Sequence, residues 1–122
     1  MADFTRASLS EADLTMANLT GANLRKANLS KAKCSQAILS EANLAGAKLQ
    51  RASLSEANLG GTKLEGADLT GASLRKAHLN KANLWKAELW KADLRGADLR
   101  GAILSEAVPK ATGGAVASRS AA

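Results

Sequence analysis

A large apolar residue recurs at every fifth position of this 122-residue chain, and this period constrains the fold more than any other feature. The series has 21 centres from Phe4 to Leu104, of which 19 are leucine and one is Cys34. An alanine precedes each centre by two positions, with Thr62 as the one exception. The repeat therefore runs from Ala2 to Glu106, and a short fixed period of this kind dictates the architecture.

A period of five suits neither an α-helix nor a long straight strand. On a helix, residues five apart step about 140° around the axis and form no stripe. On a strand, they fall on opposite faces because side chains alternate with period two. A short extended piece followed by a corner satisfies the pattern, with each alanine and its centre pointing inward and the residue between them pointing out. The period therefore predicts a solenoid whose coils stack about 4.8 Å apart, as parallel strands do.

The unit A-(D/N)-L-x-x, seen at residues 12–14, 22–24 and 67–69, resembles the repeat of the pentapeptide-repeat family. That resemblance implies an all-β solenoid, a right-handed quadrilateral parallel β-helix with four units per coil. The 21 units then make about five coils and a rod roughly 25 Å long at strand spacing. Right-handedness also agrees with the general rule for parallel β connections.

Two regions follow from the repeat boundary: a β-helix over 2–106 and a tail over 107–122. In the tail, Pro109 takes the next centre position and has no N–H to donate to a ladder. The remaining small and polar residues predict a flexible terminus, a cap or an expression remnant.

Four kinds of residue in the repeat carry local expectations. Cys34 should point inward as a small apolar filler, and the Thr62 hydroxyl should find a backbone partner. Phe4 is expected to plug the first coil or to stack on another molecule. Asn23 and Asn43, twenty residues apart, should stack in neighbouring coils, where an amide ladder would stabilise them.

The sequence contains no recognisable catalytic constellation. His78 is the one histidine and has an outward position, while a single cysteine excludes an internal disulfide and a Cys-based zinc site. We therefore expect a non-enzymatic chain with no cofactor and no metal. Residues after Met1 show no signal-peptide pattern, and no apolar run approaches a membrane span, so a cytoplasmic location away from membranes is expected.

The net charge of +6 is the feature that bears most on partners. The lysines five apart at 76, 81, 86 and 91 should form a belt around the rod. Arg75 and Arg95 should stack on one side with Arg100 beside them, which makes Arg75, Lys76, Arg95 and Arg100 a candidate basic surface. A belt fits a nucleic-acid footprint poorly, so a solvated surface is the preferred interpretation and a nucleic-acid partner is disfavoured.

Trp85 and Trp90 follow successive centres and should point outward from adjacent sides of one coil, with the outward Ile103 about one coil further on. Exposed tryptophans are favoured interface anchors. With Phe4 they form the candidate interface, although cover by the tail and plain exposure are alternatives for the tryptophans.

The family resemblance implies interaction scaffolds and, for one subset, DNA mimics that protect type II topoisomerases. Such mimicry needs an acidic surface, and the positive net charge counts against it. We expect a non-enzymatic structural or protein-interaction scaffold with an unknown protein partner and a possible homodimer by end-to-end stacking. Topoisomerase modulation and weak electrostatic nucleic-acid binding are the alternatives.

Overall fold

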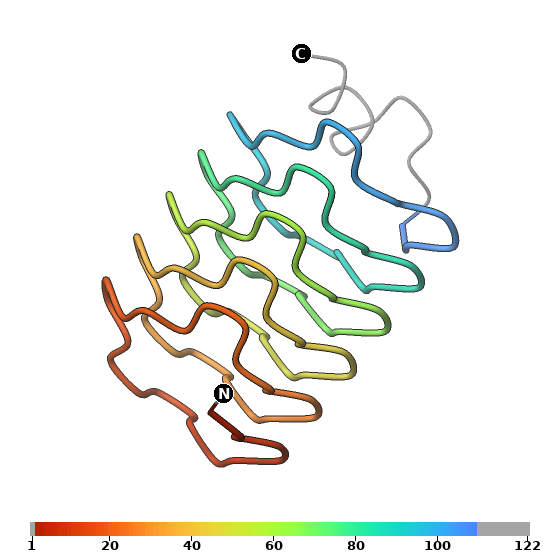
Figure 1. Cartoon of the computed structure of the whole chain (residues 1–122). Coiled ribbons are helices and arrows are strands. Elements are labelled where there is room, and N and C mark those ends of the chain that lie inside the picture. The colour runs from red at the N-terminus through yellow and green to blue at the C-terminus, as the bar shows by residue number, and fades with distance from the viewer. Residues whose placement is uncertain (1, 110–122) are drawn as a thin grey trace.

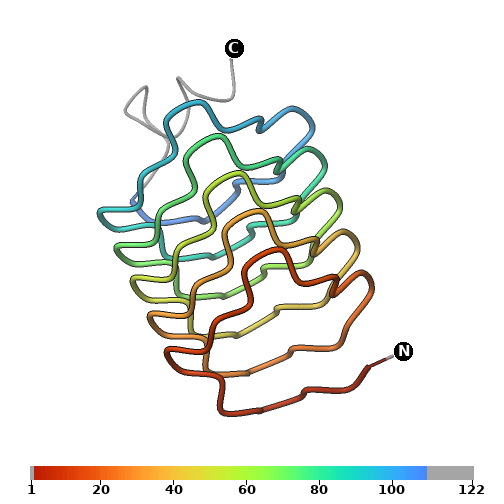
Figure 2. The ribbon, with the colours of Figure 1, turned by 90° about the vertical axis from the view of Figure 1, so that its left-hand side faces the viewer.

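The computed structural model describes residues 2–109, and they form a four-sided coil that advances steadily from one terminus toward the other (Figure 1). Parallel bridges join residues twenty apart, from Asp3 with Asn23 to Glu88 with Val108. Twenty residues are four repeat units, so each coil has four units and four sides, and successive coils lie directly over one another (Figure 2). The fold is the right-handed quadrilateral β-helix that the sequence predicts.

Within residues 2–109 there is no helix and no strand longer than a single bridge residue. A unit with a coil on each side nevertheless donates three backbone hydrogen bonds to those coils. In the unit centred on Leu44, Asn43 N donates to Ala22 O at 2.9 Å, Leu44 N to Lys63 O at 2.7 Å, and Gly46 N to Glu65 O at 2.9 Å. The coils are therefore joined by a regular ladder although no long strand is present.

Every corner is a tight turn. The turn closes through the alanine of the next unit, as when Ala47 N donates to Leu44 O at 3.0 Å. The second turn residue has φ between 58° and 74° at each corner, and seven of these residues are glycines while fourteen are not. A positive φ at this place is what a type II turn requires. The left-handed conformation costs a non-glycine residue about 1–2 kcal/mol, and the inter-coil bond from the same N–H offsets part of that cost.

The interior consists almost entirely of leucine and alanine side chains. Cys34 occupies a leucine position and is 2% exposed. Thr62 replaces an alanine, and its Oγ1 donates to Leu39 O at 2.7 Å, which supplies the expected backbone partner. Phe4 is half-buried and packs against the core from the first coil.

The asparagines before the centres do not form the amide ladder that the sequence suggests. Asn23 and Asn43 do stack, because they are bridged in the backbone ladder. However, Asn43 Oδ1 accepts a hydrogen bond from Ala45 N at 3.1 Å, and no asparagine within residues 2–109 bonds to another asparagine side chain. Each such side chain caps its own corner instead, as Asx turns do. The prediction was wrong because a nearer backbone donor is available.

The ladder continues two residues past the repeat boundary at Glu106. Ala107 is buried, and Val108 pairs with Glu88 on the preceding coil. The remainder of the expected tail, 110–122, lies outside the described residues.

Candidate functional site

Three apolar side chains, those of Trp85, Trp90 and Ile103, are exposed on neighbouring corners and coils, and we call these three residues the tryptophan surface. They are 43%, 51% and 47% exposed, respectively. The tryptophans are the first turn residues of two adjacent corners on one coil. Ile103 lies on the next coil, bridged to Asn83, which is two residues before Trp85. The predicted outward placement is confirmed, while the role of these residues in an interface stays a prediction.

The surroundings of Trp85 fix its position. Trp85 N donates to Asn83 Oδ1 at 3.1 Å, and Trp85 O accepts from Gly66 N at 2.8 Å. Lys86 Nζ lies 4.5 Å from the centroid of the indole ring, within the range of a cation–π interaction. An exposed aromatic side chain on a hydrogen-bonded corner loses little backbone freedom when it binds a partner.

Phe4 does not join the tryptophan surface. It shares a column with Leu84, four coils away, at about 19 Å by strand spacing. The candidate interface residues therefore divide between the two ends of the rod.

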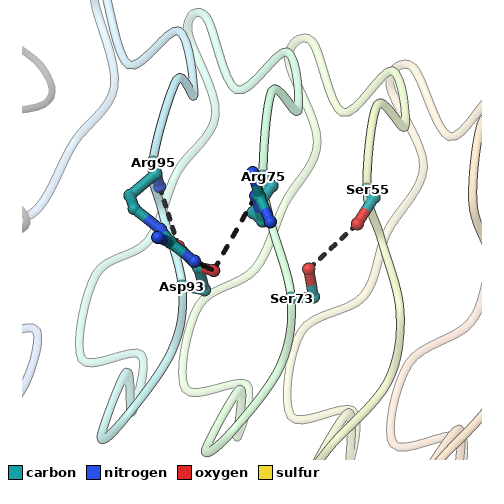
Figure 3. A network of polar contacts seen from close by, with 5 residues as sticks. All are labelled: Ser55, Ser73, Arg75, Asp93 and Arg95. Carbon is teal, nitrogen blue, oxygen red and sulfur yellow. Dashed lines mark hydrogen bonds and ion pairs between the residues drawn. The ribbon is translucent and has the colours of Figure 1, made fainter.

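Two carboxylates offset part of the charge of the candidate basic surface, and Figure 3 shows one of them, Asp93, between Arg75 and Arg95. Arg95 donates from Nε to Asp93 Oδ1 at 2.9 Å and from Nη2 to Asp93 Oδ2 at 2.7 Å. Arg75 Nε lies 4.0 Å from the same carboxylate, so Arg75 and Arg95 flank Asp93 on one side of the rod as the register predicts. Arg100 repeats the two-bond arrangement with Asp98.

These pairs change the acidity of the carboxyl groups. Hydrogen bonds from the Arg95 side chain and backbone lower the pKa of Asp93 to about 2, and Arg100 does the same to the pKa of Asp98. Both carboxylates remain ionised at neutral pH and offset charge locally. Further along the same side, Ser55 Oγ and Ser73 Oγ lie 2.9 Å apart, so the polar contacts continue onto the preceding coils (Figure 3). Of the predicted basic surface, only Lys76 has no carboxylate within 4.0 Å among the described residues.

A different basic cluster lies near the other end of the rod. A depression of about 390 Å³, which we call the cationic cleft, is lined by Thr5, Arg6, Arg25, Lys26, Ala45 and Gly46. Ion pairs among the described residues involve arginines 75, 95 and 100, so none of the cleft cations lies within 4.0 Å of a described carboxylate.

The sequence prediction did not include this cleft, although the twenty-residue register that placed Arg75 over Arg95 also applies here. Arg6 and Lys26 are twenty residues apart and occupy the same corner of successive coils. A listing of the sequence in rows of twenty would have aligned them.

The expected absence of a metal site concerns the histidine, cysteine and acidic side chains of the described residues. Residues 2–109 contain no group of three or more histidine, cysteine or acidic side chains that could hold a metal ion. His78 is exposed on a flat side, and burial raises the pKa of the Cys34 thiol to about 11. In the same part of the chain, no helix has the length and hydropathy needed to cross a membrane.

Comparison with known proteins agrees with the geometry. A family model described as pentapeptide repeats matches residues 2–40, 27–66, 52–84 and 77–108 in eight copies. A search of curated proteins found no match.

Several solved structures are similar to this chain. A pentapeptide repeat protein from the Arabidopsis thaliana thylakoid lumen is 32% identical, with a TM-score of 0.53 over 78% of this chain and 63% of its own. QnrB1, a plasmid-mediated fluoroquinolone resistance protein, is 28% identical, with a TM-score of 0.52 over 82% of this chain and 59% of its own. The chain thus spans less than two thirds of the length of these proteins.

Proposed function

Because the chain belongs to the pentapeptide repeat family, we propose that it is a non-enzymatic scaffold that binds a protein partner through the tryptophan surface. The observation that carries this proposal is the exposure of Trp85, Trp90 and Ile103 on neighbouring coils. Large apolar side chains gathered on a surface mark interaction sites, and tryptophan is enriched among the residues that contribute most to binding.

The charge distribution supports a protein partner over topoisomerase modulation by DNA mimicry. Within residues 2–109, the two turn positions of the corners hold 12 of the 15 basic residues and 5 of the 11 acidic ones, a net charge of +7. The flat sides hold the other 3 basic and 6 acidic residues, a net charge of −3. A surface whose edges are positive does not reproduce the phosphate field of DNA. The similarity to QnrB1 supports the fold alone, and this charge distribution counts against the DNA-mimic alternative.

A purified partner is needed to test the scaffold proposal. The full chain is immobilised, bound proteins are identified, and each is produced separately and titrated against the purified chain. The variant Trp85→Ala/Trp90→Ala should bind the confirmed partner at least about 100-fold more weakly. Each tryptophan at the centre of an interface contributes roughly 2 kcal/mol or more to binding.

The control variant is Ile38→Ala, which removes an exposed apolar side chain from another part of the rod. We expect it to bind within about twofold of the original chain, since isolated surface changes are usually small. Equal binding by all three proteins would contradict the proposal. Light scattering on the same samples tests self-association, because a dimer lost only in the double variant would make a second copy the partner.

A further inference from the structure

We propose that the cationic cleft and Trp85 together bind an extended acidic peptide segment of the protein partner. This inference rests on the proposed scaffold function and specifies the chemistry of what the scaffold holds. Both parts lie along one corner of the rod, which we call the binding edge. Its cationic end is the cleft, and its aromatic end is formed by Trp85 and Lys86.

The cationic end carries more positive charge than its own carboxylates offset. Arg6, Arg25 and Lys26 line the cleft and are exposed, and no described carboxylate lies within 4.0 Å of them. The carboxylate of Asp3 is close enough for Arg25 to help lower its pKa, but its Oδ1 accepts hydrogen bonds from Thr5 N at 3.0 Å and Thr5 Oγ1 at 2.6 Å. Arginine offers paired donors that match a carboxylate, and such charge-assisted bonds are roughly twice as strong as neutral ones. The cleft is therefore suited to acidic side chains.

Three of the four corner residues in the middle of the binding edge are small: Ala45, Gly46 and Gly66. Ala45 and Gly46 form the floor of the cleft on the third coil. A Cβ added at Gly46 would lie 3.3 Å from Lys26 Cγ, whereas one added at Gly66 would meet nothing within 4 Å. An extended backbone therefore has free space at Gly66, whereas at Gly46 it would lie against the Lys26 side chain.

The spacing of the two ends suits a short peptide. Arg25 and Trp85 are sixty residues apart, which is three coils at the observed register. Three coils correspond to about 14 Å, and an extended peptide advances about 3.3–3.4 Å per residue. An acidic residue in the cleft therefore places the side chain four residues away beside Trp85. Residues four apart on an extended chain also point to the same side.

Glu65 favours a peptide over a nucleic acid. This residue directly precedes Gly66 on the binding edge, one coil before Trp85. Its Oε2 accepts a hydrogen bond from Asn83 Nδ2 at 3.1 Å. Its Oε1 is buried without a hydrogen-bond partner among the described residues. A phosphate backbone that followed the whole edge would pass this carboxylate, whereas a peptide can present an uncharged residue there. Single-stranded nucleic acids also bind where successive bases stack on several aromatic side chains, and this edge offers one.

The probe is a fluorescein-labelled peptide with two adjacent aspartates and a leucine four residues after the second, DDSGSL, used with its reversed sequence to allow either chain direction. Fluorescence anisotropy measures its binding to the full chain. Arg25→Gln/Lys26→Gln is the test variant. Arg75→Gln/Lys76→Gln is the matched control, because the same two residues occupy the same repeat positions and the net charge changes equally.

We expect the test variant to bind the peptide at least about tenfold more weakly, because charge-assisted hydrogen bonds to the peptide are lost. The control variant should stay within about twofold of the original chain, since only contacts in the cleft matter. Trp85 emission, read in a Trp90→Phe background, should change as the peptide binds.

Three results would overturn the inference. The first is equal weakening by the two variants, which would indicate dependence on net charge alone. The second is tighter binding of a short single-stranded oligonucleotide than of either peptide, with the same sensitivity to the test variant. The third is no peptide binding at up to about 1 mM protein, the limit of a weak specific contact. Each would leave the scaffold proposal standing if Trp85→Ala/Trp90→Ala still abolished partner binding.

Discussion

The units 22–26 and 92–96 place an arginine at the same corner position, yet the two arginines differ in what they can bind. Their sequences are ANLRK and ADLRG. Arg95 is held by both oxygens of Asp93, whereas Arg25 follows an asparagine and has no carboxylate within 4.0 Å among the described residues. In these two units, the residue before the centre therefore decides whether the arginine is paired within its own unit.

The fold does not distinguish the two units. Asn23 Oδ1 accepts from Arg25 N at 3.2 Å, and Asp93 Oδ1 accepts from Arg95 N at 3.1 Å, so each caps its corner in the same way. The difference lies in the second atom of the side chain, which is an amide nitrogen in one unit and a carboxylate oxygen in the other. Only the oxygen can accept a hydrogen bond from a guanidinium. The A-(D/N)-L-x-x pattern thus leaves surface charge adjustable at little structural cost.

The largest expected effect tests whether the two halves of the rod have the same kind of packed interior. Leu44→Ala and Leu84→Ala should each lower the free energy of unfolding by about 2–5 kcal/mol, because each creates a cavity in the same kind of packed column. Urea unfolding followed by circular dichroism measures both. If the loss in free energy of unfolding falls within that range for one variant and outside it for the other, the two halves of the rod are packed differently.

A smaller effect is expected from converting one region into the other. Asn23→Asp should pair Arg25 as Asp93 pairs Arg95, and should weaken binding of the aspartate peptide by about threefold to tenfold, or roughly 0.7–1.4 kcal/mol. Asn58→Asp makes the same charge change before Gly60, where no arginine follows. Anisotropy titrations measure peptide binding by both variants. Equal weakening of binding by the two substitutions would contradict the comparison.

The smallest effect is on acid stability. Pairing with Arg95 and Arg100 lowers the pKa values of Asp93 and Asp98 to about 2, below the value of about 3.9 for an unfolded aspartate. A lowered pKa contributes stability that is present above pH 4 and is lost as the pH falls toward 2. Urea unfolding at several pH values should show a steeper loss over this window for the original chain than for Asp93→Asn/Asp98→Asn. Parallel curves would mean that these pairs do not stabilise the fold.

The five-residue period alone determined the coil, its inward alanines and centres, and its outward corners. Side chains alternate along extended backbone, and a narrow interior admits only residues of a limited size, so Thr62 and Cys34 could be assigned inward positions from the sequence. The family resemblance added the four sides, and the outward direction of Trp85 followed from its repeat position.

Tertiary structure decided which outward residues meet. The register of twenty residues places Arg6 and Lys26 at the same corner of successive coils, where both line the cationic cleft. Hydrogen-bond competition decided that Asn43 caps its own corner and does not form an amide ladder with its neighbours. The side-chain direction of Arg95, folded back onto Asp93, removed much of the predicted basic surface. The period specifies where backbone and core atoms lie, while the choice among several nearby partners for a flexible polar side chain depends on the distances that the folded coils create.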